Sequence, residues 1–347
     1  MRVESNVNLS ERTTLRLGGP AKNLVTVESE TELATVAAEA RAKGEELFVL
    51  GGGSNLVIAD AGANEPMVTL GLSQVTFEAT ERAVRVRVQA GHDWDALVEK
   101  TIAEGLSGLE CLSGIPGSVG ATPIQNVGAY GQEVADTIVS VRVFDQVTET
   151  FAIVPRAECE FAYRHSRFRN QRRIVVTEVE FELRQEPTSR SIRYAELAKA
   201  LGIAQGDVAP LRRVRDTVIA LRRGKGMVWD KADPESTSAG SFFTNPLVTE
   251  DVALRVDAIA GRPVPRFPSD KGRVKLPAAW LVEAAGFEKG FALGKGASIS
   301  KKHALALVNR GGTTADLLEL ARAIQRGVEQ RFGVRLEPEP IFVGCAL

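Results

Sequence analysis

The chain has 347 residues, 44% of them hydrophobic, which is enough material for about two ordinary domains and excludes a mainly disordered protein. Its 43 Lys and Arg balance 44 Asp and Glu, so its overall charge draws it neither to nucleic acid nor to an anionic membrane surface. The N-terminal residues lack the apolar segment of a secretory signal, and no apolar run reaches the length of about 18 residues that a bilayer requires. We therefore expect a cytoplasmic protein without nucleic-acid or membrane partners.

The cysteines indicate a reducing compartment. Cys111, Cys159 and Cys345 lie far apart and form neither a metal-binding pattern nor an even disulfide framework. We expect them to be small core residues, and we expect no metal.

The first part of the chain predicts a strand, a helix, a second strand and a glycine loop. Residues 13–27 end in an extended run, and Ser29 caps a helix over about residues 30–43. A short buried strand over 46–50 then runs into the loop GGGSN at 51–55. The loop therefore lies at the carboxyl end of a strand, where α/β sheets usually bind ligands.

Neither common phosphate-binding motif is present. A dinucleotide fingerprint starting at Gly51 would need glycine at position 56, where the chain has Leu56. The chain also lacks a G-x-x-x-x-G-K-[ST] loop. A Rossmann domain and a P-loop are therefore disfavoured.

A second glycine-rich loop follows a second helix. Strands are predicted near 67–70, 75–78 and 84–88, and Asp93 caps a helix that ends at Gly105. The next segment is GIPGSVGATPIQNVGAYG, which has few side chains able to form a core. Alone it is either a buried connector or a cradle whose backbone N–H groups meet a phosphate-bearing cofactor. Paired with GGGSN, it favours two loops that hold one pyrophosphate.

The middle of the chain contains a basic segment between predicted strands. Strands are expected at 138–144, 150–154 and 174–183, and the segment ECEFAYRHSRFR lies between the last two. It is either a solvated turn or an anion site. A polar stretch at 185–190 is a candidate domain boundary.

The last part of the chain predicts packing helices and one terminal strand. Helices are expected at 194–201, 211–223 and 276–285, the second with arginines on its polar side, and a long helix begins at Thr313. Two isolated residues, Ser241 in a small-residue turn and Glu339 before the strand 341–343, are by themselves more typical of a turn and a solvated carboxylate.

Five motifs in fixed order carry a resemblance that spans residues 13–344. They are GGGSN, GIPGSVGA with PIQNVGAYG, YRHSRF, AGSFFTNP and LEPE. Together they resemble the UDP-N-acetylenolpyruvoylglucosamine reductase family, flavoenzymes of bacterial peptidoglycan synthesis. The resemblance implies an α+β protein with an FAD-binding region of the vanillyl-alcohol-oxidase (PCMH) type and a C-terminal α/β substrate-binding domain.

The resemblance also implies boundaries and cofactors. The FAD region would cover 1–190, as two subdomains of about 1–70 and 71–190. The substrate domain would cover 191–347, with a last strand near 335–345 returning to the FAD region. We expect non-covalent FAD, NADPH as co-substrate, and a monomer. The residues that match the cofactor-binding motifs are Gly51, Gly52, Gly53, Ser54, Asn55, Gly114, Ile115, Pro116, Gly117, Ser118, Gly120, Asn126 and Gly128.

The family motifs place catalytic roles on Arg164, Ser241 and Glu339, with Glu337 the competing glutamate. In the substrate domain they match Lys225 of RRGK to the residue that meets the substrate diphosphate. The branch of the family with a tyrosine loop matches this chain at Tyr194 of RYAEL, and Asn245 of FFTNP is a further substrate neighbour. Other basic residues nearby could instead meet the diphosphate; they are Arg222, Arg223 and Lys231. The segment KADPEST departs from the family pattern.

The implied reaction reduces the enolpyruvyl ether of UDP-N-acetylglucosamine enolpyruvate to UDP-N-acetylmuramate, with hydride from flavin N5 to C3. Arg164 would hold the substrate carboxylate as negative charge develops. A protonated Glu339 would donate a hydrogen bond, whereas an ionised one would orient Arg164 or a water. Ser241 would protonate C2.

Two other functions remain open. One is another FAD-dependent oxidase or dehydrogenase of the same scaffold acting on an alcohol or sugar, which would not need SFFTNP and LEPE. The other is a nucleotide-binding regulator that kept the cradle and lost its chemistry. The presence of all three candidate catalytic residues disfavours the regulator.

Overall fold

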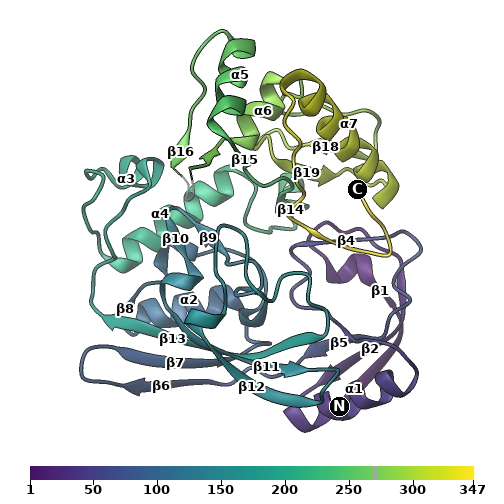
Figure 1. The fold of residues 1–347 in the computed structure, drawn as a ribbon. Helices are drawn as coiled ribbons and strands as arrows, with labels where there is room; N and C mark the ends of the chain where they lie inside the picture. The colour runs from purple at the N-terminus through teal and green to yellow at the C-terminus, as the bar shows by residue number, and fades with distance from the viewer. Residues whose placement is uncertain (269–271) are drawn as a thin grey trace. The chain divides into compact units, whose positions relative to one another are not determined.

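The structure is a computed structural model that describes residues 1–268 and 272–347, and the chain forms two compact units (Figure 1). The first unit consists of Met1–Val7, Ala21–Gly52 and Asn64–Arg223. The second consists of Asn8–Pro20, Gly53–Ala63 and Gly224–Leu347. Both units are assembled from segments that are distant in the sequence.

A small sheet near the N-terminus opens the first unit. Strands β2 (Pro20–Val27) and β3 (Phe48–Val49) both pair in parallel with β5 (Met67–Leu70), and β1 (Arg2–Asn8) forms the edge beside β2. The crossover between the parallel strands is α1 (Glu30–Ala42), which Ser29 caps as predicted. The apolar side of α1 packs on this sheet, because its buried residues recur at helical spacing; they are Leu33, Val36, Ala37 and Ala40.

A larger antiparallel sheet forms the centre of the first unit. Its strand order is β12-β11-β13-β7-β6, and β8 pairs with the end of β13. Val86 and Val88 are fully buried, whereas Arg85 and Arg87 lie on the other face and pair with glutamates of β13. The alternation in the sequence therefore forms one core face, as predicted. The strands are β6 (Val75–Ala79), β7 (Val84–Gln89), β8 (Leu106–Ser107), β11 (Ile138–Asp145), β12 (Thr150–Pro155) and β13 (Ile174–Gln185).

The second glycine-rich segment lies against α2 (Trp94–Ala103), whose N-cap is Asp93. Trp94 is fully buried and donates from Nε1 to the Leu112 carbonyl at 3.1 Å. The helix therefore fixes the start of the segment. The segment contains only short elements: η2 (Glu110–Leu112), η3 (Val119–Ala121), β9 (Gly128–Ala129), β10 (Gln132–Glu133) and η4 (Val134–Asp136).

The expected boundary at residue 190 differs from the boundary near 223 that the contacts give. Helices α3 (Ala195–Leu201) and α4 (Leu211–Gly224) join the first unit because their apolar sides pack around Cys111. The buried residues of this cluster include Ile192, Leu197, Val214 and Val218. A polar linker at 185–190 therefore marks a loop within the unit.

The second unit has a helical core around a three-stranded sheet. Strand β19 (Ala306–Asn309) pairs with β14 (Ser238–Ser241) on one side and β18 (Ala297–Ile299) on the other. The long helix α7 (Thr314–Phe332) begins with the predicted capping box between Thr313 and Asp316. The remaining elements of this unit are α5 (Glu250–Ala260), α6 (Ala278–Ala284), β15 (Leu247–Val248), β16 (Phe267–Pro268), β17 (Val274–Lys275) and the short turns η1 (Leu9–Arg12) and η6 (Pro234–Ser236). The short turn η5 (Arg156–Glu158) belongs to the first unit.

The last strand pairs with a strand from the early part of the chain. β20 (Ile341–Val343) lies parallel to β4 (Leu56–Ile58), directly after the GGGSN loop. Leu15 and Leu17 also belong to the core of this second unit. The last strand therefore pairs with a segment from before residue 190, but β4 and residues 8–20 group with the C-terminal unit rather than with the first unit, and the return of this strand to the FAD region stays a prediction.

Among the described residues, no helix is long and apolar enough to cross a membrane, and no group of three or more His, Cys, Asp or Glu could hold a metal ion. All three cysteines are unpaired; two are buried and Cys345 is half-buried. Burial raises the pKa of the Cys159 thiol to about 11, which keeps it protonated near neutral pH.

Candidate active site

The two predicted cradle loops meet at their backbones. A Cβ atom added to Gly52 would lie 2.6 Å from the Gly117 Cα, which is closer than any side chain can approach. A Cβ on Gly51 would lie 2.9 Å from the Ser118 Oγ. The two loops can lie this close because these positions are glycine, whereas their joint role in holding a cofactor stays a prediction.

Other glycines of the motifs have packing reasons of their own. Gly53 has a φ of +62°, and its missing Cβ would lie 1.9 Å from the Arg12 carbonyl oxygen. A Cβ on Gly120 would meet the Ala90 Cβ at 2.5 Å. Close packing alone requires glycine at 120, so its matching to a cofactor role stays a prediction.

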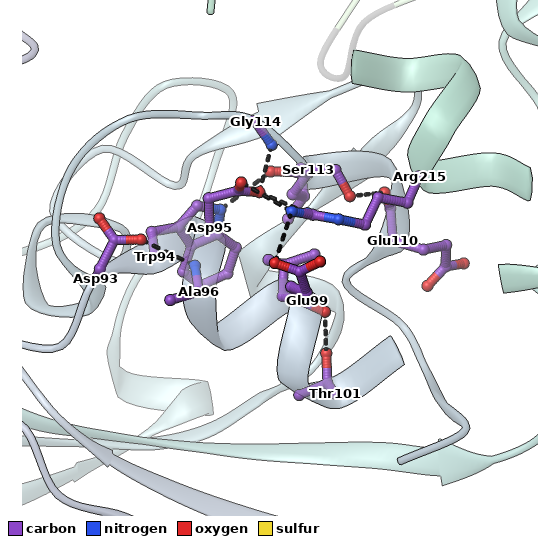
Figure 2. Close-up of polar contacts among 12 residues, drawn as sticks. Asp93, Trp94, Asp95, Ala96, Glu99, Thr101, Glu110, Ser113, Gly114 and Arg215 are labelled. Carbon is purple, nitrogen blue, oxygen red and sulfur yellow. Dashed lines mark hydrogen bonds and ion pairs between the residues drawn. The ribbon is translucent and has the colours of Figure 1, made fainter. Parts of the chain in front are cut away.

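The loop that begins at Gly114 is fixed at several points to the N-terminus of α2. The Gly114 N–H donates to Asp95 Oδ1 at 2.6 Å (Figure 2). The Trp94 N–H donates to the Gly117 carbonyl at 3.0 Å. Arg222 of α4 donates from Nε to the Gly114 carbonyl at 3.2 Å. Burial lowers the pKa of Arg222 to about 10, which still leaves it a cation near neutral pH.

Asn126 connects the second half of this segment to the basic turn. Its Nδ2 donates to Glu133 at 2.7 Å and to the Ala162 carbonyl at 3.1 Å, while its Oδ1 accepts from the Ala135 N–H at 3.2 Å. The side chain is 1% exposed. These contacts give Asn126 a positioning role in the protein, and its predicted contact with the cofactor stays a prediction.

Arg164 lies in a strained turn. Its φ is +51°, a conformation that L-residues other than Asn and Asp adopt rarely. Its Nη2 donates to the Gly128 carbonyl at 2.9 Å, and its own carbonyl accepts from Arg169 Nη1 at 2.6 Å. Its guanidinium also lies 5.5 Å from the centre of the Tyr163 ring. Arg164 is thus held beside the second cradle segment by groups on both sides.

Tyr194 lies at the start of α3, 39% exposed, with its ring edge-on to Tyr130 at 5.5 Å between centroids. Burial raises the pKa of Tyr130 to about 12 and also raises the pKa of Tyr194. Both phenols are therefore protonated donors near neutral pH.

In the second unit, the structure brings the segments of two predicted catalytic residues together. The Glu339 N–H donates to the carbonyl of Phe242, the neighbour of Ser241, at 2.9 Å. Asn55, 284 positions earlier than Glu339, donates from Nδ2 to the Glu339 carbonyl at 3.3 Å. Glu339 is half-buried and Glu337 is exposed, which favours Glu339 over its competitor.

The predicted substrate residues of the second unit lie on its loops. Asn245 accepts from the Ala278 N–H, at the start of α6, at 2.8 Å through its Oδ1. Lys225 follows α4 directly in the chain and is half-buried, while the competing residues Arg223 and Lys231 are exposed.

The geometry shows three residues that sequence patterns did not single out. Asp95 and Arg215 form an ion pair beside Gly114, and Arg169 holds the Arg164 backbone. Arg215 was counted among the polar arginines of its helix, yet it is 5% exposed. The sequence does contain a signal for this ion pair: Asp95 and Glu99 lie on one face of their helix, and Arg215 and Arg222 lie on one face of theirs.

The cradle fits a dinucleotide cofactor. Two loops with touching backbones and positive φ at Gly114 and Gly117 can present main-chain N–H groups without side chains in the way. The positions beside them that match the family's cofactor-binding motifs are Gly51, Gly52, Ile115 and Ser118. The first loop continues with Gly53, Ser54 and Asn55.

Comparison with known proteins gives matches to both parts of the chain. A model of the C-terminal domain of UDP-N-acetylenolpyruvoylglucosamine reductase matches residues 233–343, and a model of an FAD binding domain matches residues 21–151. The predicted α+β fold, with an FAD-binding region followed by this C-terminal domain, is thereby confirmed.

Relatives extend over the whole chain. The UDP-N-acetylenolpyruvoylglucosamine reductase of Thermobifida fusca is 51% identical over 350 residues, covering 99% of this chain and 98% of the relative. That of Salinispora arenicola is 51% identical over 353 residues, covering 99% and 96%. The crystal structure of the Thermus caldophilus reductase has a TM-score of 0.67 at 30% identity, and the match covers 99% of each chain.

Proposed function

Because the chain belongs to the UDP-N-acetylenolpyruvoylglucosamine reductase family, we propose that it uses NADPH to reduce the enolpyruvyl ether of UDP-N-acetylglucosamine enolpyruvate to UDP-N-acetylmuramate. The chain is an FAD-dependent oxidoreductase of peptidoglycan precursor synthesis. We place its reaction in the cytoplasm, where NADPH and nucleotide sugars are held, and propose that it acts as a monomer.

The observation that carries the proposal is the backbone pairing around Glu339. The segment of LEPE accepts and donates hydrogen bonds with Asn55 of the first glycine loop and with Phe242 of the SFFTNP motif. Three motifs that are far apart in the sequence are therefore neighbours within one unit. A scaffold that only bound a nucleotide would have no need for this arrangement.

FAD, when bound, would supply a hydride to C3 of the substrate, and NADPH would be the source of its electrons. The remaining work belongs to side chains. Arg164 would engage the substrate carboxylate with charge-assisted hydrogen bonds that strengthen as charge accumulates there. Its strained backbone and the hold of Arg169 support this role, because a preorganised donor loses less conformational entropy when the substrate binds.

Ser241 would give its proton to C2, because the carbanionic carbon is basic enough to take a proton from a hydroxyl. Glu339 would stabilise the same charge, either as a neutral acid that donates a hydrogen bond or as a carboxylate that orients Arg164 or a water. Tyr194, Lys225 and Asn245 would bind the substrate, with Lys225 at its diphosphate.

Replacing Ser241 with alanine separates the two half-reactions. Under anaerobic conditions the yellow holoenzyme of Ser241→Ala should bleach with NADPH at a normal rate, because that step does not involve the serine. Reoxidation by UDP-N-acetylglucosamine enolpyruvate should slow by about 10²- to 10⁴-fold, the usual contribution of a positioned proton donor. Stopped-flow absorbance of the flavin measures both steps.

Ser73→Ala is the matched control, since Ser73 is exposed, lies far from Ser241 in the sequence and undergoes the same chemical change. It should reoxidise at the wild-type rate. Normal reoxidation in Ser241→Ala removes that residue from the proton-donor role. Bleaching by an alcohol or sugar without NADPH would instead favour an oxidase of the same scaffold.

A further inference from the structure

Gly114, where the second cradle loop begins, is held through both of its backbone polar groups. Its N–H donates to Asp95 Oδ1 at 2.6 Å, and its carbonyl accepts from Arg222 Nε at 3.2 Å. The residue is buried, and its φ is +71°. The two peptide units on either side of the Gly114 Cα are therefore each held by a side chain, one from α2 and one from α4.

Asp95 is itself clamped. Arg215 donates to Asp95 through Nη1 at 2.6 Å and through Nη2 at 2.9 Å, the two-point geometry that arginine and carboxylate favour (Figure 2). The Arg215 side chain is only 6% exposed. Although burial opposes ionisation, the hydrogen bonds from Arg215 and Gly114 lower the pKa of Asp95, so the carboxylate stays charged.

One helix provides both arginines. Arg215 and Arg222 are seven positions apart on α4, which is about two turns, so their side chains leave the same face. Val214 and Val218 of the same helix are fully buried in the cluster around Cys111. The packing that fixes α4 thereby fixes Arg222, which bonds Gly114 directly, and Arg215, which holds Asp95.

The loop has its next anchor only three residues later. The Gly117 carbonyl accepts from the Trp94 N–H at 3.0 Å, and the Gly117 Cα is the atom nearest to the site of a Cβ on Gly52. Only Ile115 and Pro116 lie between the anchors. With both ends fixed, a change at Gly114 must alter the direction of the N–H groups in this short turn.

We propose that Asp95, clamped by Arg215, is a positioning residue for FAD: the Asp95–Arg215 pair orients Gly114 and so sets the shape of the cradle turn at Ile115–Ser118. The proposal rests on the proposed function in that this turn faces the cofactor. Neither side chain needs to touch the cofactor. Loss of the pair leaves the loop in place but lets Gly114 rotate, so the cofactor meets a loop of the wrong shape.

The test compares four single substitutions in the purified holoenzyme. Asp95→Asn and Arg215→Met each remove the ion pair. Glu99→Gln is the matched control, because Glu99 lies one turn further along α2 and 3.6 Å from the same Arg215, yet its side chain is 54% exposed and the Gly114 N–H donates to Asp95 instead. Arg215→Lys keeps the charge and loses the two-point geometry. It serves as the milder variant if Arg215→Met fails to fold.

Two readouts are needed. Hydrogen–deuterium exchange of the peptide spanning Gly114–Ser118 reports whether the loop has loosened, and the flavin fluorescence that appears on dilution reports FAD release. Outer residues that orient binding groups at metal sites commonly carry about 10- to 100-fold in affinity, so we expect FAD to dissociate roughly tenfold faster or more in the pair variants. The visible spectrum of bound flavin should shift as well, which a loss of global stability would not cause.

The outcomes distinguish the positioning role of the Asp95–Arg215 pair from the assignment of the loop to the cofactor site. Faster exchange together with faster FAD release in the pair variants, but not in Glu99→Gln, supports the positioning role. Unchanged exchange overturns it while leaving the cradle assignment intact. Faster exchange with unchanged FAD release and an unchanged spectrum overturns it too, because the loop then does not face the cofactor, and the cradle assignment fails with it.

Discussion

Replacing Gly52 with alanine should weaken FAD binding while leaving the fold intact. A Cβ at position 52 would stand 2.6 Å from the Gly117 Cα, 3.2 Å from its carbonyl carbon and 3.3 Å from its nitrogen. Carbon atoms in favourable contact lie about 3.5–4.0 Å apart, so the two backbones must separate by roughly 1 Å. Neither can yield by rotating a side chain, because every clashing atom is main chain.

Overpacking of this kind costs about 1–3 kcal/mol, which corresponds to about 5- to 150-fold in a dissociation constant. Gly52 is exposed, so the loops can move apart without disturbing the core, and the cost should appear in FAD affinity rather than in the melting temperature. Titration of the protein, freed of flavin, with FAD measures the affinity, and thermal unfolding without FAD measures the fold.

The control is Gly294→Ala, since a Cβ at 294 meets no atom within 4 Å and the backbone there is not strained. It should bind FAD as the wild type does. If Gly52→Ala binds FAD within about twofold of the wild type, the contact between the two loops does not shape the cofactor site.

Two further predictions concern single side chains. Arg169→Met should lower kcat while leaving FAD affinity unchanged, because it releases the carbonyl of the strained Arg164. The control is Arg167→Met, since Arg167 lies two positions away and its side chain is 45% exposed. Equal kcat values in the two variants would contradict the reasoning. Glu235→Gln should lower the free energy of unfolding at pH 7, since Glu235 is 7% exposed and pairs with Arg310 at 2.7 Å. Burial alone would raise the pKa of Glu235, but hydrogen bonds from Ser300 and Arg310 lower it below the ordinary value of 4.5. The extra stability of the wild type is therefore present above that pH and is lost as the pH falls through the pKa of the folded state. Urea titrations across pH 3–7 should show the stabilities of the two proteins converging in acid.

Elements with strong local signals were predictable from the sequence. Helices α1, α2 and α7 have a capping side chain and a regular apolar side, and the alternating strand β7 has one apolar face. Helix α5 was not predicted, because only Ala253 and Val256 are buried along its length and neither gives a strong periodic signal. Burial in this helix is too slight for a pattern of hydrophobicity to show it.

The burial of charged residues was the harder part of the site to predict. The run of arginines in α4 is typical of a solvated face, yet Arg215 and Arg222 are buried because Asp95 and the Gly114 carbonyl accept their hydrogen bonds. Those partners lie more than 100 positions away, and only the tertiary fold pairs them. By contrast, the glycines of the cradle were identifiable because they cluster in two short runs of the sequence, although the contacts that require glycine there, such as that of Gly52 with Gly117, are tertiary.

The pairing of β20 with β4 has a consequence for the order in which the protein is made. Synthesis delivers Gly53–Ala63 early, whereas β20 comes after every other element of the chain. Domains generally fold as units during synthesis, and the segments of the first unit are complete by Arg223. Strand β4 must meanwhile keep an open edge, which is a site where nascent chains can pair wrongly. We therefore expect the first unit to fold while β4 is still unpaired, and we expect chaperones that shield exposed strands to bind the nascent chain until β20 has emerged.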